Sequence, residues 1–418
     1  MNFLTGAIKC LFCGILVLVV FRTGSTSAGD ITDQTTSLDQ GLLRNLFHLF
    51  RHWMFNFVGQ TGLKTRGSFL QEKIPDSLPF PCDVTIGRSK QVPRSVHKLR
   101  PGDFNVIAAM GDSLTAASGA SSSGFVDLYM ENRGLSWSIG GQWNWRNVTT
   151  LPNILKEFNP KLVGYSLGDA YPIHRATQFN MAEIGAVSYD MPFMAKSLVK
   201  RIRADRRVDF KRDWKLVTIT IGGNDICTFV CTMQRPEDLP VKHRLRMIKT
   251  LRYIRDNMPR TFVNIVSVPL VSTVVSINSK PGVCHALHHG ECSCWVGRLY
   301  NQTEASRDRW RRIQQQMIKA EVEVSEMDEF RRLDEFAVVH QPWSTQLTLK
   351  MNGKDVDYSL LAYDCFHMSQ KGNAFAGTAL WNNMLEPVGQ KRTNWRPLFE
   401  KFHCPTAKAP YIYTYDNS

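Results

Sequence analysis

The sequence predicts an α/β fold in which helices cover both faces of a central parallel sheet. Short apolar runs that suit buried strands occur at 104–110, 216–221, 262–268 and 336–340, with a shorter candidate at 135–139. Helical patterns lie between them, at 191–203, 245–257 and 307–322. Because strands that alternate with helices favour a parallel sheet, we expect functional residues at the carboxyl ends of the strands.

The first 28 residues indicate a secretory signal peptide, so we predict that the protein is secreted. Lys9 precedes an apolar run at 10–21, and the small residues at 26–28 offer a cleavage site. An N-terminal membrane anchor is the alternative, less favoured because the run is shorter than the roughly 20 residues that span a bilayer. Sequons at Asn147 and Asn301 predict glycosylation in the same compartment.

Composition and charge narrow the class of protein. With 43% hydrophobic and 21% charged residues, the 418-residue chain is not wholly disordered. Its formal net charge of +14 would favour binding to a negatively charged partner, such as nucleic acid, anionic lipid or acidic glycans. The basic residues are, however, spread along the chain and do not form a cluster. For a secreted protein we therefore expect no nucleic-acid partner, and we predict no obligate protein partner.

Eight cysteines follow residue 28, and an even number in an oxidising compartment predicts disulfides. They are Cys82, Cys227, Cys231, Cys284, Cys292, Cys294, Cys365 and Cys404. Two candidate pairings are Cys227 with Cys231, and Cys365 with Cys404. The segment 284–294 also resembles a metal-ligand cluster, but its irregular spacing favours disulfides with surface histidines.

An amphipathic helix is predicted before the sheet, at 42–58. Its polar arc contains Arg44, Asn45, His48, Arg51, His52 and Asn56, with Phe55 among them, and the opposite side carries Leu43, Leu46, Phe47, Phe50, Trp53, Met54 and Phe57. Such a helix either packs on the domain or lies in a membrane interface with Arg44 and Arg51 toward the headgroups. Packing is favoured because apolar helix faces are usually buried, but we keep membrane-surface contact through Leu42–Val58 as a hypothesis.

A serine follows the first predicted strand, in Gly111-Asp112-Ser113-Leu114-Thr115. At a strand-to-helix turn, its hydroxyl would lie at the carboxyl edge of the sheet, where backbone N–H groups stabilise negative charge. In the alternative interpretation, Asp112 or Ser113 simply caps the helix. No G-x-S-x-G elbow surrounds Ser113, so an α/β-hydrolase fold is not supported.

Two further segments carry residues suited to nucleophilic catalysis. After a later strand, Gly222-Gly223-Asn224-Asp225 could point the Asn224 amide at an oxyanion, although this composition is also common in turns. Asp364 lies three residues before His367, so its carboxylate can orient the imidazole and stabilise the protonated form. A structural histidine is the alternative for His367.

Together, the GDSL, GGND and DxxH segments resemble the SGNH (GDSL) hydrolase superfamily. Further blocks resemble the repeat unit of the phospholipase B family, and the similarity covers about residues 75–418. These blocks are 80–82, 95–97, 99–101, 149–155, 381–387 and 404–406. The resemblance implies a flavodoxin-like, three-layer sandwich with a central parallel sheet.

The resemblance also implies a secreted serine ester hydrolase that releases fatty acids from phospholipids and lysophospholipids through an acyl-enzyme. Ser113 would be the nucleophile, His367 the general base and acid, and Asp364 the orienting carboxylate. The Ser113 N–H, the Gly185 N–H and the Asn224 side chain would form the oxyanion hole. We expect no metal and no other cofactor, because His367 activates the nucleophile.

The choice of Gly185 over Gly140 or Gly141 rests on the match of 180–186 to the second block of the family. The chain then divides into a signal peptide at 1–28, an N-terminal extension with amphipathic helix and strap at 29–95, a catalytic domain at 96–390 and a tail packed on it at 391–418. Two alternatives stay open: an esterase for carbohydrate or acyloxyacyl esters, and a non-catalytic lipid-binding or host-interaction protein.

Overall fold

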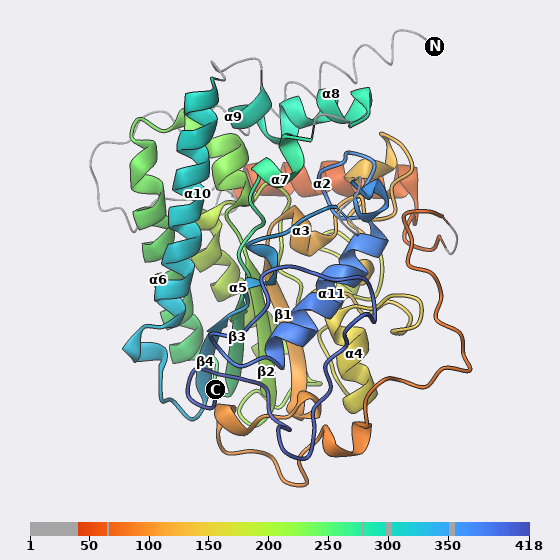
Figure 1. The fold of residues 1–418 in the computed structure, drawn as a ribbon, viewed down its shortest axis with the longest axis vertical. Helices are drawn as coiled ribbons and strands as arrows, with labels where there is room; N and C mark the ends of the chain where they lie inside the picture. The colour runs from red at the N-terminus through yellow and green to blue at the C-terminus, as the bar shows by residue number, and fades with distance from the viewer. Residues whose placement is uncertain (1–40, 65–66, 278–279, 298–302, 351–355) are drawn as a thin grey trace.

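The fold is built on a four-stranded parallel sheet with the strand order β1-β2-β3-β4 (Figure 1). This computed structural model describes residues 41–418 except 65–66, 278–279, 298–302 and 351–355, and it leaves out the side chains of 41–44 and 47. The strands are β1 (Phe104–Gly111), β2 (Trp214–Thr220), β3 (Thr261–Ile265) and β4 (Phe336–His340). All neighbouring pairs are parallel, which confirms the predicted α/β fold.

Helices cover both faces of the sheet and complete a three-layer sandwich (Figure 1). One outer layer contains α5 (Met191–Ala204), α6 (Leu239–Asn257) and α10 (Glu304–Ser325), and the other contains α4 (Leu151–Phe158) and α11 (Gln370–Met384). Five more helices lie toward the carboxyl end of the sheet, at the top of Figure 1. They are α2 (Gly41–Val58), α3 (Ser113–Ala116), α7 (Ser272–Val275), α8 (Gly282–Glu291) and α9 (Ser293–Val296).

The side chains of β1 show how the sheet separates two cores. Ile107 and Ala109 belong to the core beneath α4 and α11, whereas Val106, Ala108 and Met110 belong to the core beneath α5, α6 and α10. Successive side chains of a strand point to opposite faces, so a strand covered on both sides is apolar along its length. The continuous apolar runs in the sequence have this origin.

The predicted short strand at 135–139 is absent. The chain there follows a 3-10 turn (Arg133–Leu135), and its backbone groups bond within turns, to the separate segments at Leu151 and Ser166 and to the Asn373 side chain, without forming a strand ladder. The Trp137 N–H donates to Asn373 Oδ1 (3.0 Å), while the Trp137 ring is buried. An apolar run fixes burial but does not distinguish a strand from a buried loop.

Four disulfides join the described cysteines, and both candidate pairings from the sequence are wrong. The bonds are Cys82–Cys404, Cys227–Cys292, Cys231–Cys294 and Cys284–Cys365. Cys227 and Cys231 lie on consecutive helical turns (Asp225–Phe229 and Val230–Thr232) and each bonds a separate cysteine beside α9. Proximity along the chain was therefore a poor guide to pairing.

The helix α2 packs on the domain with a face that includes His48 and Arg51 of the predicted polar arc together with Met54 of the predicted apolar side, so its orientation differs from the one expected from the amphipathic pattern. The buried Arg51 guanidinium pairs with Glu183 (3.0 Å) and with Glu131, and it lies 4.5 Å from the centroid of the Tyr171 ring. His48 lies 3.3 Å from the same Glu183. Burial lowers the pKa of Arg51 to about 10, so the guanidinium remains charged at neutral pH. The expectation that Arg51 faces lipid headgroups is wrong, and the side chain of Arg44 lies outside the described residues.

This orientation leaves an apolar stripe on the outer side of α2. Leu46, Leu49, Trp53 and Phe57 are exposed by 55%, 63%, 51% and 70%. The inward polar contacts explain the orientation, because Glu131 and Glu183 are themselves buried and a buried carboxylate without a cation is costly. Within the described ranges, no helix is both long and apolar enough to cross a bilayer.

Candidate active site

Ser113 is the first residue of α3 and follows β1 directly. Asp112 Oδ1 accepts the Leu114 N–H (3.0 Å), so Asp112 caps the helix and leaves the Ser113 hydroxyl available for chemistry. A side chain at Gly111 would place its Cβ 2.4 Å from the Thr220 carbonyl oxygen, so the close approach of β1 and β2 requires glycine there. The serine therefore sits where the sheet ends, as the sequence predicts.

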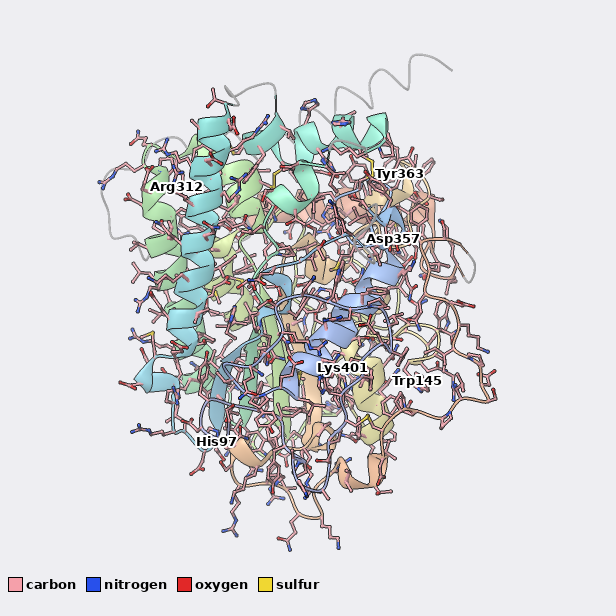
Figure 2. The ribbon with its side chains drawn as sticks, viewed as in Figure 1. His97, Trp145, Arg312, Asp357, Tyr363 and Lys401 are labelled. Carbon is pink, nitrogen blue, oxygen red and sulfur yellow. A yellow bond between two sulfur atoms is a disulfide. The ribbon has the colours of Figure 1, made fainter. Side chains whose placement is uncertain are left out.

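Asp364 and His367 come from an irregular turn near the C-terminal end of the chain. Cys365 adopts φ +55°, a left-handed conformation that is uncommon for residues other than glycine. The turn lets Asp364 Oδ1 accept the N–H groups of Phe366 and His367, both at 2.9 Å. Figure 2 shows Tyr363, which precedes Asp364, at the end of the molecule that carries α8, away from His97, which precedes β1.

The three residues form one hydrogen-bonded chain. His367 Nε2 lies 2.8 Å from Ser113 Oγ, and His367 Nδ1 lies 2.6 Å from Asp364 Oδ2. Burial disfavours the imidazolium, but the charge and hydrogen bond of Asp364 outweigh burial and raise the pKa of His367 to about 9. Burial likewise opposes ionisation of Asp364, yet His367 and the two backbone donors hold the pKa of Asp364 below its ordinary value. This is the geometry of a nucleophile, a base and an orienting carboxylate.

Gly185 and Asn224 also come together beside this chain. The Asn224 amide donates one N–H to the Ala186 carbonyl oxygen (2.9 Å), and its other N–H has no hydrogen-bond acceptor among the described residues. Gly185 has φ +74°, and the space beside it is open. The Ser113 N–H, at the first position of α3, has no carbonyl partner inside its helix. Three donors are thus available at one edge of the sheet.

The two other glycines that were considered for this role are committed elsewhere. The Gly140 N–H donates to the Ser136 carbonyl oxygen (2.7 Å), and the Gly141 N–H donates to that of Ser166 (2.9 Å). Backbone donors already used inside the fold cannot bind a substrate oxygen. Gly140 and Gly141 are therefore unsuited to the role, and Gly185 stays the predicted donor.

An apolar pocket opens beside Ser113, and sequence analysis did not find its walls. Asp112, Ser113 and Asn224 line part of it. The walls include Trp137, Val268, Leu270, Trp343, Leu347 and Trp395. These residues are scattered over four separate segments, so no local pattern marks them as neighbours of the serine.

The segment formed by α8 and α9 is bonded to both sides of the site, and we call it the clip (Gly282–Val296). Cys284 is bonded to Cys365 inside the histidine turn, while two further disulfides join the clip to the helical turns after Asn224. His288 is buried, and its Nε2 donates to the Asp364 carbonyl oxygen (3.0 Å). The idea of a metal cluster at 284–294 is wrong because its cysteines form disulfides, and His288 is not a surface histidine.

The clip also brings Glu291 to the catalytic carboxylate. Side-chain donor or acceptor atoms of Glu291, Asp364 and His367 all lie within 4.8 Å of one another. Sequence analysis missed Glu291, since the only signal near it was the irregular cysteine pattern.

Among the predicted glycosylation sites, Asn147 is half-buried, and Asn301 lies outside the described residues.

Comparison with protein families places residues 107–380 within one family model, described as GDSL-like lipase/acylhydrolase. The chain is 35% identical to phospholipase B1, membrane-associated, of Mus musculus over 396 residues, which is 93% of this chain and 25% of that protein. It is 38% identical to the protein of the same name from Homo sapiens over 339 residues, or 79% of this chain and 23% of that protein. The chain thus spans about a quarter of the length of these relatives.

Solved structures give a weaker resemblance. An extracellular lipase from Streptomyces rimosus matches 66% of this chain and 98% of its own, with 15% identity and a TM-score of 0.32. A phospholipase A1 from Streptomyces albidoflavus matches 67% and 98%, with 13% identity and the same TM-score.

Proposed function

The chain belongs to the GDSL-like lipase/acylhydrolase family, whose members are carboxylic ester hydrolases, and on that premise we propose that it releases fatty acids from phospholipids and lysophospholipids. One observation supports this substrate above others: the pocket beside Ser113 is walled by aromatic and aliphatic side chains. Such walls suit an acyl chain and offer few hydrogen bonds to a sugar, which disfavours a carbohydrate ester. The names of the relatives point to the same substrate class.

The proposed reaction uses an acyl-enzyme. His367 Nε2 takes the proton of the Ser113 hydroxyl as Oγ attacks the ester carbonyl carbon, and Asp364 stabilises the imidazolium that forms. The negative oxygen would be held by the N–H groups of Ser113 and Gly185 and by the Asn224 amide. His367 then gives its proton to the leaving alcohol, and water repeats the sequence to release the fatty acid.

A single experiment separates the enzyme from its alternatives. A fluorophosphonate probe should label Ser113 of the wild type and should not label Ser113→Ala. Acyl-chain release is then measured on phospholipids, lysophospholipids and acylated sugars. Labelling without release from either lipid would contradict the substrate, whereas absence of labelling would contradict the enzyme. Activity should persist in EDTA, because no step of this mechanism uses a metal ion.

We also propose that α2 contacts the lipid surface that contains the substrate. Its apolar stripe (Leu46, Leu49, Trp53 and Phe57) faces outward, and the Trp53 and Phe57 rings stack with centroids 5.8 Å apart. The same helix is held by Arg51 and Glu183, two residues before Gly185, so the stripe lies on the side of the domain that carries the candidate site. Aromatic residues with an apolar body favour the membrane–water boundary.

Deletion of α2 would take Arg51 and His48 away from the buried Glu183, so the test uses outward residues only. Trp53→Ser/Phe57→Ser should lower hydrolysis of phospholipid vesicles and leave a soluble short-chain ester unaffected. The matched control is Val84→Ser/Val92→Ser, which replaces two exposed apolar residues of the strap before β1. Equal losses on both substrates, or a lower Tm, would mean that the stripe is covered by another part of this chain or by a partner.

Secretion is part of the same proposal and is supported by the pattern at 1–28 and by the disulfides among the described cysteines. Expression of the full chain in a secretory cell should yield protein in the medium that begins near Gly29. Retention of the intact N-terminus on the cell membrane would overturn this part of the proposal.

A further inference from the structure

Glu291 places a second carboxyl beside the Asp364–His367 pair. It is the last residue of α8, and its Oε2 is buried with no hydrogen-bond donor among the described residues. A buried carboxylate oxygen without a donor is costly, whereas a carboxylic acid can itself donate. The side-chain oxygens of Glu291 and Asp364 lie within 4.8 Å of each other, and a side-chain hydrogen bond with Asp364 is among the causes that raise the pKa of Glu291.

We propose that Glu291 is a positioning residue of the catalytic site, which keeps its proton at neutral pH and donates a hydrogen bond to the Asp364 carboxylate. This inference rests on the proposed function of Asp364 and His367.

The location of the proton follows from the surroundings of the two carboxyls. Two adjacent buried carboxyls do not both ionise readily, so one of them holds a proton. Asp364 accepts bonds from the Phe366 N–H, the His367 N–H and His367 Nδ1, all of which stabilise its anion. Glu291 has no comparable set of donors, and burial together with the Asp364 charge raises the pKa of Glu291 to about 9.

Other titratable groups around the pair do not supply the missing positive charge. Tyr129, in the 3-10 turn Asp127–Tyr129, is neutral at pH 7, since burial raises its pKa. His288 is neutral as well, because burial and Lys280 lower the pKa of His288 to about 4. Asp112 faces His367 from the nucleophile side, and burial raises the pKa of Asp112 to about 7. Of these three groups and His367, all within the described residues, His367 is the one that can offset a second negative charge here.

The clip prevents Glu291 from moving away from Asp364. Cys284, at the start of α8, is bonded to Cys365, and Cys292, directly after Glu291, is bonded to Cys227. A donated hydrogen bond withdraws charge from Asp364, so it limits the basicity of His367. It also holds the carboxylate in the orientation that receives His367 Nδ1.

The test compares Glu291→Gln, which keeps an N–H donor without a charge, with Glu291→Leu, which removes the donor. The readout is the pH profile of kcat/KM on a soluble ester, and in particular its acid limb, the pH range over which activity falls as His367 becomes protonated. We expect the limb of Glu291→Gln to coincide with that of the wild type, and that of Glu291→Leu to move to higher pH as Asp364 becomes more basic. If Glu291 were ionised, Glu291→Gln would move the limb to lower pH, because a negative charge beside His367 is lost. That result would overturn the proposal.

Infrared difference spectroscopy gives a second measurement that needs no activity. The difference spectrum of wild type minus Glu291→Gln at neutral pH should show the C=O stretch of a protonated carboxyl, because Asp112, whose pKa burial raises to about 7, contributes to both proteins and cancels. Absence of this band would refute the protonated Glu291 even in a fully active enzyme. A wild type that shows the band but hydrolyses no ester would instead contradict the proposed function.

Discussion

The two halves of the candidate site reach the same edge of the sheet by different means. Ser113 is positioned by regular structure, because β1 pairs with β2 along its length and ends directly at α3. His367 is positioned by an irregular turn that a disulfide and the buried His288 hold to the clip. The comparison teaches that hydrogen-bonded strands fix the nucleophile, whereas covalent bonds between distant segments fix the base.

The largest loss of activity should come from replacing Ser113 or His367, the catalytic residue in each half of the site. Ser113→Ala and His367→Ala should each lower kcat by about 10⁴-fold or more, because the members of a triad act as one unit. The double variant should be no slower than either single one, as measured by hydrolysis of a soluble ester. A Ser113→Ala variant that kept a tenth of wild-type turnover would contradict the assignment.

Loss of the Asn224 amide, a hydrogen-bond donor beside Ser113, should lower kcat less than loss of Ser113 or His367. Asn224→Ala should lower kcat by roughly 10²–10³-fold with little change in KM, since the amide is needed chiefly when charge develops on the substrate oxygen. Steady-state kinetics on the same ester checks this, with the Tm measured to show that loss of the bond to Ala186 leaves the fold intact. A change confined to KM would assign Asn224 to substrate binding instead.

The disulfides give the most direct test of the comparison itself. Cys284→Ser/Cys365→Ser should lower kcat by up to about 10²-fold, since a displacement of the base by roughly 1 Å is enough for such a loss. The control is Cys82→Ser/Cys404→Ser, which should cost about 2–4 kcal/mol of stability but leave kcat nearly unchanged. Equal kcat losses in both variants would mean that the bond inside the histidine turn has no special role.

Acid should have the most gradual effect, spread over several pH units. The base must be neutral, and the pKa of His367 is raised to about 9 because Asp364 outweighs burial. The neutral fraction, and with it kcat/KM, should therefore fall about tenfold for each pH unit below this value. Asp364→Asn should move this limb to lower pH, since the charge that stabilises the imidazolium is lost. A flat profile from pH 9 to pH 6 would contradict the raised pKa.

The same contrast explains what could be predicted from the sequence. The strands and Ser113 follow from local patterns, since a buried parallel strand and a strand-to-helix turn leave signatures within a few residues. Asp364 and His367 lie three residues apart, so a motif also marks them. Glu291 and the pocket walls depend on which distant cysteines and apolar residues meet, and no local pattern records that.

The helix α2 shows a second limit of sequence analysis. Its periodicity predicts a polar arc and an apolar side, but the face that meets the domain takes His48 and Arg51 from one and Met54 from the other. That face depends on Glu131 and Glu183, which are far away in sequence and buried at the contact. An amphipathic pattern alone therefore does not determine the buried face, because the partner charges contribute to it.

The bond between Cys82 and Cys404 closes most of the chain into a covalent ring. A protease that cuts one surface loop between these two residues opens the ring but leaves its two fragments joined. Ser113 and His367 would then remain in one particle, held together by sulfur as well as by packing. Nicked molecules should migrate as intact protein on a non-reducing gel and separate into fragments only after reduction.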